Sequence, residues 1–289
     1  MPAQPLVIDL HTHSTCSDGT QAPSEVVRSA AAAGIDVLSL TDHDAISGWA
    51  PAARTASELQ ICLVPGVELS TQVEGISVHI LAYLIDPEHR ELADLMAAVR
   101  RHRDNRMRST VDLLSSDGYP VDYNAIREHV GEGVTLGRPH VADALVRSGT
   151  FVDRNAVFAD LLHSRSRYYV RHWAPQASAA IELIRAAGGV PIMAHPFAHA
   201  RGHTVTEFMI GELVEAGLGG LEVHHRDHDA VAMQQAGALC ARWGLIQTGS
   251  SDYHGTGKSN ALAEFTTDPA QFDRIVTQGS GSPLLGHTP

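Results

Sequence analysis

Short apolar runs alternate with amphipathic stretches in the first and last thirds of this chain. The runs have the length and the branched side chains of buried strands, and the stretches between them have helical periodicity. We expect strands over residues 7–10, 35–40, 61–64, 77–85, 190–194, 220–223 and 245–248. We expect helices over residues 23–33, 47–59, 176–187, 206–216, 229–243 and 271–277. This alternation predicts an α/β fold, a closed or nearly closed barrel of mainly parallel strands.

The middle of the chain interrupts the alternation. A long charged helix is expected over residues 87–117, and shorter helices over 123–129, 139–146 and 154–162. No strand of comparable strength lies between Asp86 and Tyr168. We therefore predict a barrel made of residues 1–100 and 171–289, with a helical insertion over residues 101–170 and approximate boundaries.

Histidines and carboxylates stand at or near the end of every expected strand. Active sites of such barrels lie at the carboxyl ends of the strands, so these side chains should meet. Two histidines spaced as His11-x-His13 point to the same face of a strand and can bind one cation. Imidazoles combined with carboxylates suit zinc, manganese or iron better than calcium or magnesium. The set comprises His11, His13, Asp18, His43, Glu68, His79, His195, His224, His225, Asp252 and His254.

Other residues have less specific interpretations. A histidine taken alone is more often structural or exposed than a metal ligand. We apply this to the histidines outside the pattern, namely His89, His102, His129, His163, His172 and His199. Cys16 could be a nucleophile, but no third orienting group can be named, which favours a loop or core role. Neither a G-x-S-x-G motif nor a P-loop motif is present.

Composition narrows the range of partners. The 289 residues include 18 histidines and carry a formal net charge of −12. An acidic surface repels phosphate backbones, so we do not expect binding to duplex nucleic acid. No apolar stretch of membrane-spanning length or signal-peptide pattern is found, so no membrane partner is expected. The three cysteines lack the spacing of a disulfide framework, which favours a cytoplasmic location; the oligomeric state is not indicated.

Five motifs at the strand ends form one recognisable set. They are Asp9-Leu10-His11-Thr12-His13, Thr41-Asp42-His43-Asp44, Gly66-x-Glu68, Ala194-His195-Pro196 and Ser251-Asp252-Tyr253-His254. The set resembles the polymerase-and-histidinol-phosphatase (PHP) family of the amidohydrolase superfamily. The resemblance implies a distorted (β/α)7 TIM-like barrel that binds two to three divalent cations, with Mn²⁺ expected first and Zn²⁺ or Fe²⁺ as alternatives.

The resemblance also implies a ligand assignment. The first metal is assigned to His11, His13, Glu68 and Asp252. The second is assigned to Glu68, His79 and His195, and the third to Asp18, His43 and His254. Histidinol phosphatases tend to have histidine where this chain has Asp18, which weakens the interpretation of this chain as a histidinol phosphatase.

Two further motifs narrow the expected substrate. Leu136-Gly137-Arg138-Pro139-His140-Val141-Ala142 and Gly220-Leu221-Glu222-Val223 resemble the subgroup that removes the 3′-phosphate from nucleoside 3′,5′-bisphosphates. Relatives in that subgroup also trim short oligoribonucleotides from the 5′ end, so a 5′-3′ exonuclease is the alternative. Less favoured alternatives are a histidinol-phosphatase-like phosphatase, an amidohydrolase that cleaves C–N bonds, and a non-catalytic metal-binding module.

The expected mechanism is attack by a hydroxide that bridges two metals, with Asp252 orienting it. His224 or His225 would protonate the leaving oxygen or contact the phosphate. Arg138 and His140 would bind the second phosphate, because a guanidinium matches phosphate oxygens. Arg138 could instead pair with an acidic neighbour, and Lys258 could touch the substrate.

A run of arginines lies on the expected long helix. At helical spacing it spreads around more than one face, so we expect a solvated surface. The run is Arg100, Arg101, Arg103, Arg106 and Arg108.

Overall fold

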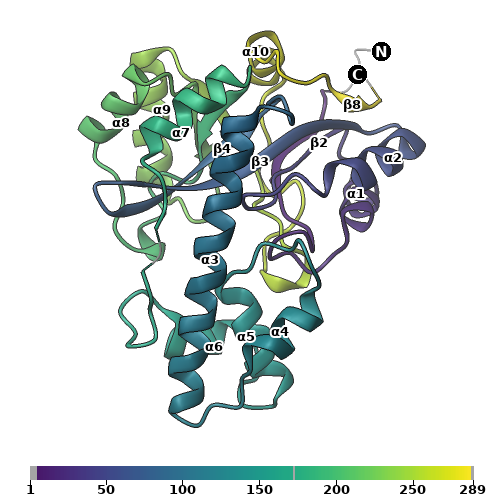
Figure 1. The fold of residues 1–289 in the computed structure, drawn as a ribbon. Coiled ribbons are helices and arrows are strands. Elements are labelled where there is room, and N and C mark those ends of the chain that lie inside the picture. Colours follow the sequence, from purple (N-terminus) through teal and green to yellow (C-terminus); the bar gives the residue numbers. More distant parts are fainter. Residues whose placement is uncertain (1–4, 172, 288–289) are drawn as a thin grey trace.

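The computed structural model describes residues 5–171 and 173–287. Seven strands lie side by side in chain order, and a short eighth strand pairs with the third (Figure 1). Parallel backbone bonding at Thr12 and Tyr253 links the two ends of the sheet, so the barrel is nearly closed as predicted. The strands are β1 (Ile8–Thr12), β2 (Val37–Leu40), β3 (Cys62–Val73), β4 (Ile76–Tyr83), β5 (Val190–Met193), β6 (Gly220–His224), β7 (Ile246–Gly249) and β8 (Leu285–Gly286).

One strand departs from the expected alternation. β4 runs antiparallel to both β3 and β5, whereas β1, β2 and β3 are mutually parallel, as are β5, β6 and β7. β3 continues to Val73 and joins β4 through a two-residue turn, with positive φ at Glu74 and Gly75. Such a turn matches the twist of a hairpin. The prediction of residues 61–64 was therefore too short, and Glu68 lies inside β3 rather than after it.

Helices cover the outside of this sheet. Trp49 and residues of α7–α9 pack in one apolar cluster with β3, β4 and β6, while α1 and α2 bury Val26, Ala30 and Ala52 against β2. The helices are α1 (Pro23–Ala32), α2 (Trp49–Leu59), α7 (Ala177–Ala186), α8 (Glu207–Glu215), α9 (Ala230–Trp243) and α10 (Pro269–Gln278), with short 3₁₀ turns η2 (His199–Arg201) and η3 (Gly255–Gly257).

The described residues between β4 and α7 form helices and no strand. They are α3 (Arg90–Ser116), α4 (Tyr123–Val130), α5 (Arg138–Arg147), α6 (Arg154–Val157) and the π-helical turn η1 (Phe158–Leu162). α3 starts in the barrel core with Leu92 and Met96, and its last half lies in a separate apolar cluster with Met107 and Leu114. We call residues 101–170 the helical segment; its division from the barrel as a domain stays a prediction.

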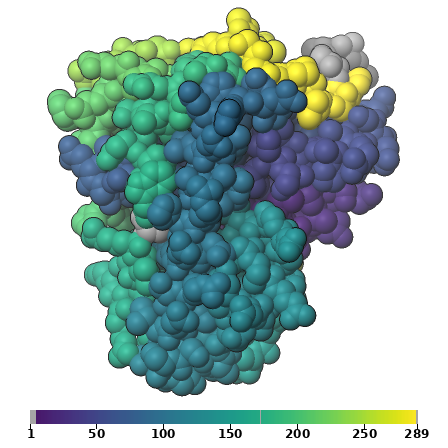
Figure 2. All heavy atoms as spheres, in the orientation of Figure 1, coloured from purple at the N-terminus to yellow at the C-terminus, as the bar shows by residue number. Residues whose placement is uncertain are grey.

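Figure 2 shows α3 running along one face of the molecule, from the barrel at the top to the tip of the helical segment. At 27 residues the helix is about 40 Å long, enough to connect both parts rigidly. None of the helices in the described ranges has the length and apolar character needed to cross a bilayer.

Candidate metal centre

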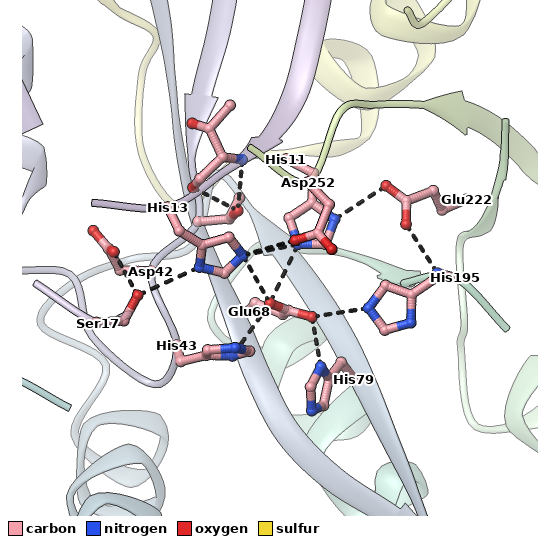
Figure 3. Close-up of polar contacts among 12 residues, drawn as sticks. His11, His13, Ser17, Asp42, His43, Glu68, His79, His195, Glu222 and Asp252 are labelled. Carbon is pink, nitrogen blue, oxygen red and sulfur yellow. Dashed lines mark hydrogen bonds and ion pairs between the residues drawn. The ribbon is translucent and has the colours of Figure 1, made fainter. Parts of the chain in front are cut away.

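The nine predicted metal ligands, of which Figure 3 labels all but Asp18 and His254, converge on one largely buried pocket. Glu68 lies at its centre. One carboxylate oxygen of Glu68 is within 3.2 Å of ring nitrogens of His11, His13 and His43. The other oxygen lies 2.6 Å from His79 Nδ1 and 3.3 Å from His195 Nε2. Each oxygen thus faces its own group of imidazoles, as a carboxylate that bridges two cations would.

The antiparallel strand explains how His79 reaches this pocket. Ser70 of β3 pairs with His79 of β4, so His79 lies two residues beyond Glu68 along the hairpin. In a strand that runs the other way, the first half lies at the end where the parallel strands finish. His79 therefore joins ligands that follow the parallel strands.

Three groups of side chains have ligand atoms within 4.8 Å of one another. They are His13, Asp18, His43 and His254; His11, His13 and Asp252; and His43, Glu68 and His79. These groups overlap the three sets that the family resemblance implies. The differences are that His13 joins Asp18, His43 and His254, that His43 stands in place of His195 beside Glu68 and His79, and that Glu68 is absent from the group of His11, His13 and Asp252.

The donors fit divalent cations. Nδ1 of His43 and Nε2 of His254 are buried and make no hydrogen bond among the described residues, although each lies 3.2 Å from a carboxylate oxygen, of Glu68 and of Asp18 respectively. Buried polar atoms are rarely left without a partner, so these nitrogens indicate a ligand that binds them. Burial holds the pKa of His43 and of His195 well below its usual value, which keeps both rings neutral and able to bind a cation.

Charge interactions inside the pocket also shift pKa values, for Glu68 and His13 against the effect of burial. Burial alone would raise the pKa of Glu68, but the imidazoles of His43, His79 and His11 hold it well below its usual value. Burial lowers the pKa of His13, yet Asp252, Glu68 and Asp18 raise it to about 9 overall. Burial, Lys258 and His13 lower the pKa of His254 to about 4. Cation binding would therefore displace a proton from His13.

Glu222 supports two of the ligands and was not predicted as a site residue. It is fully buried on β6, and its Oε1 lies 3.1 Å from His11 Nδ1. Its Oε2 accepts the backbone N–H of His195 at 2.9 Å. A carboxylate on Nδ1 leaves Nε2 free for a cation and fixes the ring orientation. The available sequence signal was a carboxylate inside a strand that is otherwise apolar.

Strained backbone occurs at three of the same strand ends. Asp44, His195 and Asp252 have φ values of 52°, 32° and 52°. Non-glycine residues in this region cost about 1–3 kcal/mol each and tend to occur where the surroundings enforce a functional geometry. The hydrogen bonds around Asp44 provide such enforcement, because its carboxylate accepts from the amide and the hydroxyl of Ser70.

The two candidate proton donors differ in position. His224 is exposed at the end of β6, whereas His225 is fully buried. Nδ1 of His225 accepts the backbone N–H of Asp227 at 3.0 Å, so the proton of the neutral ring is on Nε2. That nitrogen lies 3.4 Å from Asp252 Oδ2. The geometry favours His225 over His224.

The expected substrate residues have varied surroundings. Arg138 donates to the carbonyl of Leu162 at 2.7 Å, and its guanidinium lies over the rings of Phe158 and Tyr169. These contacts do not include the acidic neighbour that was the alternative for Arg138. His140 is buried, with Nδ1 accepting the N–H of Gly137. The Lys258 ammonium lies 3.0 Å from Asp252.

The prediction of a solvated arginine run on α3 was wrong on the face that meets the barrel. Arg101 and Arg108 are exposed, but Arg103 donates to Ser70 Oγ at 2.7 Å and to the carbonyl of Leu136 at 3.0 Å. Burial, together with the charges of Arg138 and Arg103, lowers the pKa of Arg106 to about 10. Helical periodicity predicts which residues of α3 share a face. It does not predict that β3, which carries Ser70, contacts one of those faces.

Arg201 was missed because it lies at the end of the short 3₁₀ turn η2, in a segment without a motif. Its Nη2 donates to Asp252 Oδ2 at 2.7 Å, its Nη1 lies 3.1 Å from His195 Nε2, and its Nε donates to Asp227 at 2.5 Å. A guanidinium therefore stands at the rim of the metal pocket.

The remaining interpretations concern single residues. His89 caps α3 by accepting the N–H of Leu92, and His172 lies outside the described residues. Burial and the nearby Asp42 raise the pKa of the Cys16 thiol, which disfavours a nucleophile.

Fold and pocket together define a class of protein, a barrel whose strand ends carry a buried centre for several cations. The family model described as the PHP domain matches residues 9–177. The match covers more than half of the chain, so the chain belongs to the PHP-domain family.

Two relatives align over most of the chain. The 3′,5′-nucleoside bisphosphate phosphatase of Chromobacterium violaceum is 33% identical over 90% of this chain and 92% of its own length. A 5′-3′ exoribonuclease of Haemophilus influenzae is 34% identical over 85% of this chain and 89% of its own length. By name, one relative thus acts on nucleoside bisphosphates and the other on RNA.

Solved structures agree with the fold. A protein of Bifidobacterium adolescentis, provisionally described as a metal-dependent phosphoesterase, superposes with a TM-score of 0.92. It is 33% identical, and the match covers 96% of this chain and 98% of that one. An amidohydrolase of Chromobacterium violaceum, with sulfate and no metal bound, has a TM-score of 0.85 at 31% identity, covering 96% and 97% of the two chains.

Proposed function

We propose that this protein removes the 3′-phosphate from nucleoside 3′,5′-bisphosphates. It is a metal-dependent phosphoesterase of the PHP family. The observation that carries the finer proposal is a group of three arginines, Arg103, Arg106 and Arg138, beside the metal pocket. Burial lowers the pKa of Arg106 and Arg138, and the charges of their arginine neighbours lower it further. Such crowded positive charge favours a bound anion.

The arginine group adjoins the cation pocket. Arg103 contacts Ser70, two residues from Glu68, and Asp44, next to His43. A substrate with two phosphates can therefore place one at the cations and one at the arginines. Tyr169 and Phe158, which lie against Arg138, add aromatic surface near the second phosphate. A sulfate bound to the Chromobacterium violaceum amidohydrolase, a tetrahedral dianion like phosphate, agrees with an anion site in this fold.

The proposed chemistry divides between cations and side chains. Bound divalent cations, Mn²⁺ in our proposal, would activate water and offset the charge of the phosphate. Asp252 lies between the ligands and a cationic rim, with Oδ1 facing His13 and Oδ2 facing Arg201. In this proposal Asp252 orients the attacking water or hydroxide. Arg201 and Lys258 would neutralise the scissile phosphate as negative charge grows on its oxygens.

The leaving oxygen of the nucleoside needs a proton. His225 Nε2–H points into the pocket and can supply it, because Nδ1 is occupied by the N–H of Asp227. Because Nδ1 of His225 accepts this hydrogen bond, the ring keeps the tautomer with its proton on Nε2. The one histidine of β6 itself, His224, has an exposed side chain.

A second candidate is 5′-3′ cleavage of short oligoribonucleotides. The Haemophilus influenzae relative supports it by name. So does the distribution of charge, because residues 101–170 hold ten of the 21 basic side chains and nine of the 33 acidic ones. The remainder of the chain is strongly acidic, which suits a short single strand better than a long one.

The test is a substrate comparison on metal-reconstituted protein after metal analysis. Phosphate release is measured from adenosine 3′,5′-bisphosphate, 3′-AMP, 5′-AMP and histidinol phosphate, and mononucleotide release from a 5′-phosphorylated trimer. We expect the bisphosphate to have the highest kcat/KM. Release of mononucleotides without phosphate release from the bisphosphate would favour the exonuclease. A preference for histidinol phosphate would overturn the proposal.

A further inference from the structure

We propose that the third metal site is assembled jointly by the barrel and the helical segment, with Arg103 and Arg154 as positioning residues. We call its three ligands, Asp18, His43 and His254, the distal cluster. The proposal rests on the proposed function only in requiring that this cluster bind a cation. It adds that cation binding and docking of the helical segment stabilise each other.

The three ligands of the distal cluster share one weakness. Each follows a strand, but none belongs to one: Asp18 follows β1, His43 follows β2 and His254 follows β7. Loops of this kind keep a fixed shape only when other parts of the molecule satisfy their backbone and polar groups. The helical segment supplies such contacts to all three loops.

Arg103 and its neighbour Arg100 hold the loop of His43. Asp44 follows His43 directly, is fully buried and has φ of 52°. Arg100 Nη1 donates to the carbonyl of Asp44 at 2.5 Å, and Arg103 Nη1 lies 3.4 Å from its carboxylate. The same guanidinium donates to Ser70 Oγ at 2.7 Å. Through Nε, Arg103 also donates to the carbonyl of Leu136, next to the start of α5.

Arg154 holds the loops of Asp18 and His254. It forms a two-pronged ion pair with Asp143 on α5, with N–O distances of 2.5 and 2.7 Å. The remaining nitrogen, Nη1, donates to the carbonyl of Asp18 at 3.4 Å. It also packs on Gly257, where an added Cβ would come within 2.1 Å of it. Arg154 thus fills a space that only glycine leaves, three residues after His254.

A backbone contact completes the interface. The N–H of Thr135, in the helical segment, donates to the carbonyl of Cys16 at 3.1 Å, two residues before Asp18. The other ligands depend less on this interface. Glu68 and His79 lie on paired strands, and Glu222 of the barrel orients His11. Disturbing the interface should therefore weaken the third site selectively.

The physical reason is linkage. A cation that binds only the assembled cluster stabilises that assembly, and the stabilised interface raises the affinity for the cation by the same factor. The effect is reciprocal, so it has two independent readouts. One is the affinity of the weakest cation site, and the other is the protection of interface amides against hydrogen exchange.

The first experiment uses the variants Arg103→Gln and Arg154→Gln. The matched control is Arg127→Gln, because Arg127 pairs with Asp104 and with the carbonyls of Gly131 and Val134, all within the helical segment. Mn²⁺ is titrated calorimetrically into metal-stripped full-length protein, and bound metal is counted by mass spectrometry. We expect the weakest class of sites to lose about tenfold or more in affinity in the two test variants. Wild type and Arg127→Gln should agree.

The second experiment needs no variant. Hydrogen exchange of the wild-type protein is followed with and without Mn²⁺. We expect Mn²⁺ to slow exchange of the Thr135 amide. The amide of Ala125, which donates to Asp122 inside the helical segment, should not change.

Several outcomes would overturn the inference. Unchanged weakest-site affinity in both test variants would do so, as would equal weakening of every site. Unchanged exchange of the Thr135 amide would do so as well. So would an Asp18→Asn variant that binds Mn²⁺ as the wild type does. Absence of phosphate release from every ester would instead overturn the proposed function and leave this linkage standing.

Discussion

Glu222 joins two predicted ligands of the metal pocket, His11 and His195, that come from strands four places apart in the barrel sheet. Its carboxylate lies 3.1 Å from Nδ1 of His11 on β1 and accepts the backbone N–H of His195, which follows β5. Because the residue is fully buried, water cannot replace it in either contact. The pocket therefore depends on a side chain that itself faces no cation.

We predict that Glu222→Ala weakens Mn²⁺ binding by about 10–100-fold, the usual effect of removing a carboxylate behind a ligating imidazole. Glu222→Gln should weaken it less, since an amide oxygen still accepts one of the two hydrogen bonds. Calorimetric titration of metal-stripped protein measures the change. Glu215→Gln, on the exposed side of α8, is the control. Equal affinities for wild type and Glu222→Ala would show that His11 needs no such support.

We predict that His225→Gln lowers kcat by about 10²–10⁴-fold, the range for loss of a general acid. Metal content should not change, because His225 is outside the predicted ligand set. His224→Gln replaces the exposed neighbour and should keep most activity. Steady-state phosphate release and metal analysis are compared for the two variants. A larger loss in His224→Gln would reverse the assignment.

We predict that Arg138→Ala raises KM for adenosine 3′,5′-bisphosphate by about 10–100-fold, because a charged hydrogen bond contributes about 1.5–3 kcal/mol. KM for 3′-AMP, which has no second phosphate, should change little. Arg147→Ala, at the exposed end of the same helix, serves as the matched control. An equal rise for both substrates would place Arg138 outside the second phosphate site.

The pKa shifts predict two pH limits for the stability of the metal-free protein. The pKa of His13 is raised from 6.5 to about 9, so its stabilising effect is complete below pH 6.5 and is lost as the pH rises through about 9. The pKa of His254 is lowered to about 4, so its effect is present above pH 6.5 and is lost as the pH falls through about 4. Melting temperatures of EDTA-treated protein should decline on both sides of pH 6.5. A rise between pH 6.5 and 9 would contradict the shift of His13.

The sequence located the candidate ligands, whose role stays a prediction, better than the residues that support them. His11, His43, Glu68 and Asp252 stand where apolar runs end, and a hydrophobic pattern locates those positions directly. The reversed direction of β4 could not be predicted, because an apolar run has the same pattern in either direction. The turn at Glu74-Gly75 was the only local sign of it.

Contacts between residues that are distant in the chain also could not be predicted from the sequence. Arg103, Arg154 and Arg201 occur on a helix or in a loop without any motif, and their partners are distant in the chain. Periodicity assigns such residues to solvent because it records only the element on which they lie. The division between barrel and helical segment at residues 101 and 170 stays a prediction.

The β3–β4 hairpin also bears on the order in which the metal pocket forms during folding. Glu68 and His79 are eleven residues apart, so closing the loop between them costs little chain entropy. Asp18 and His254 meet only when the two ends of the chain come together, as do Thr20 and the carbonyl of His254 beside them. The pair of Glu68 and His79 is thus a local structure that can form early. The contact between Asp18 and His254 is among the last that the folding chain can make.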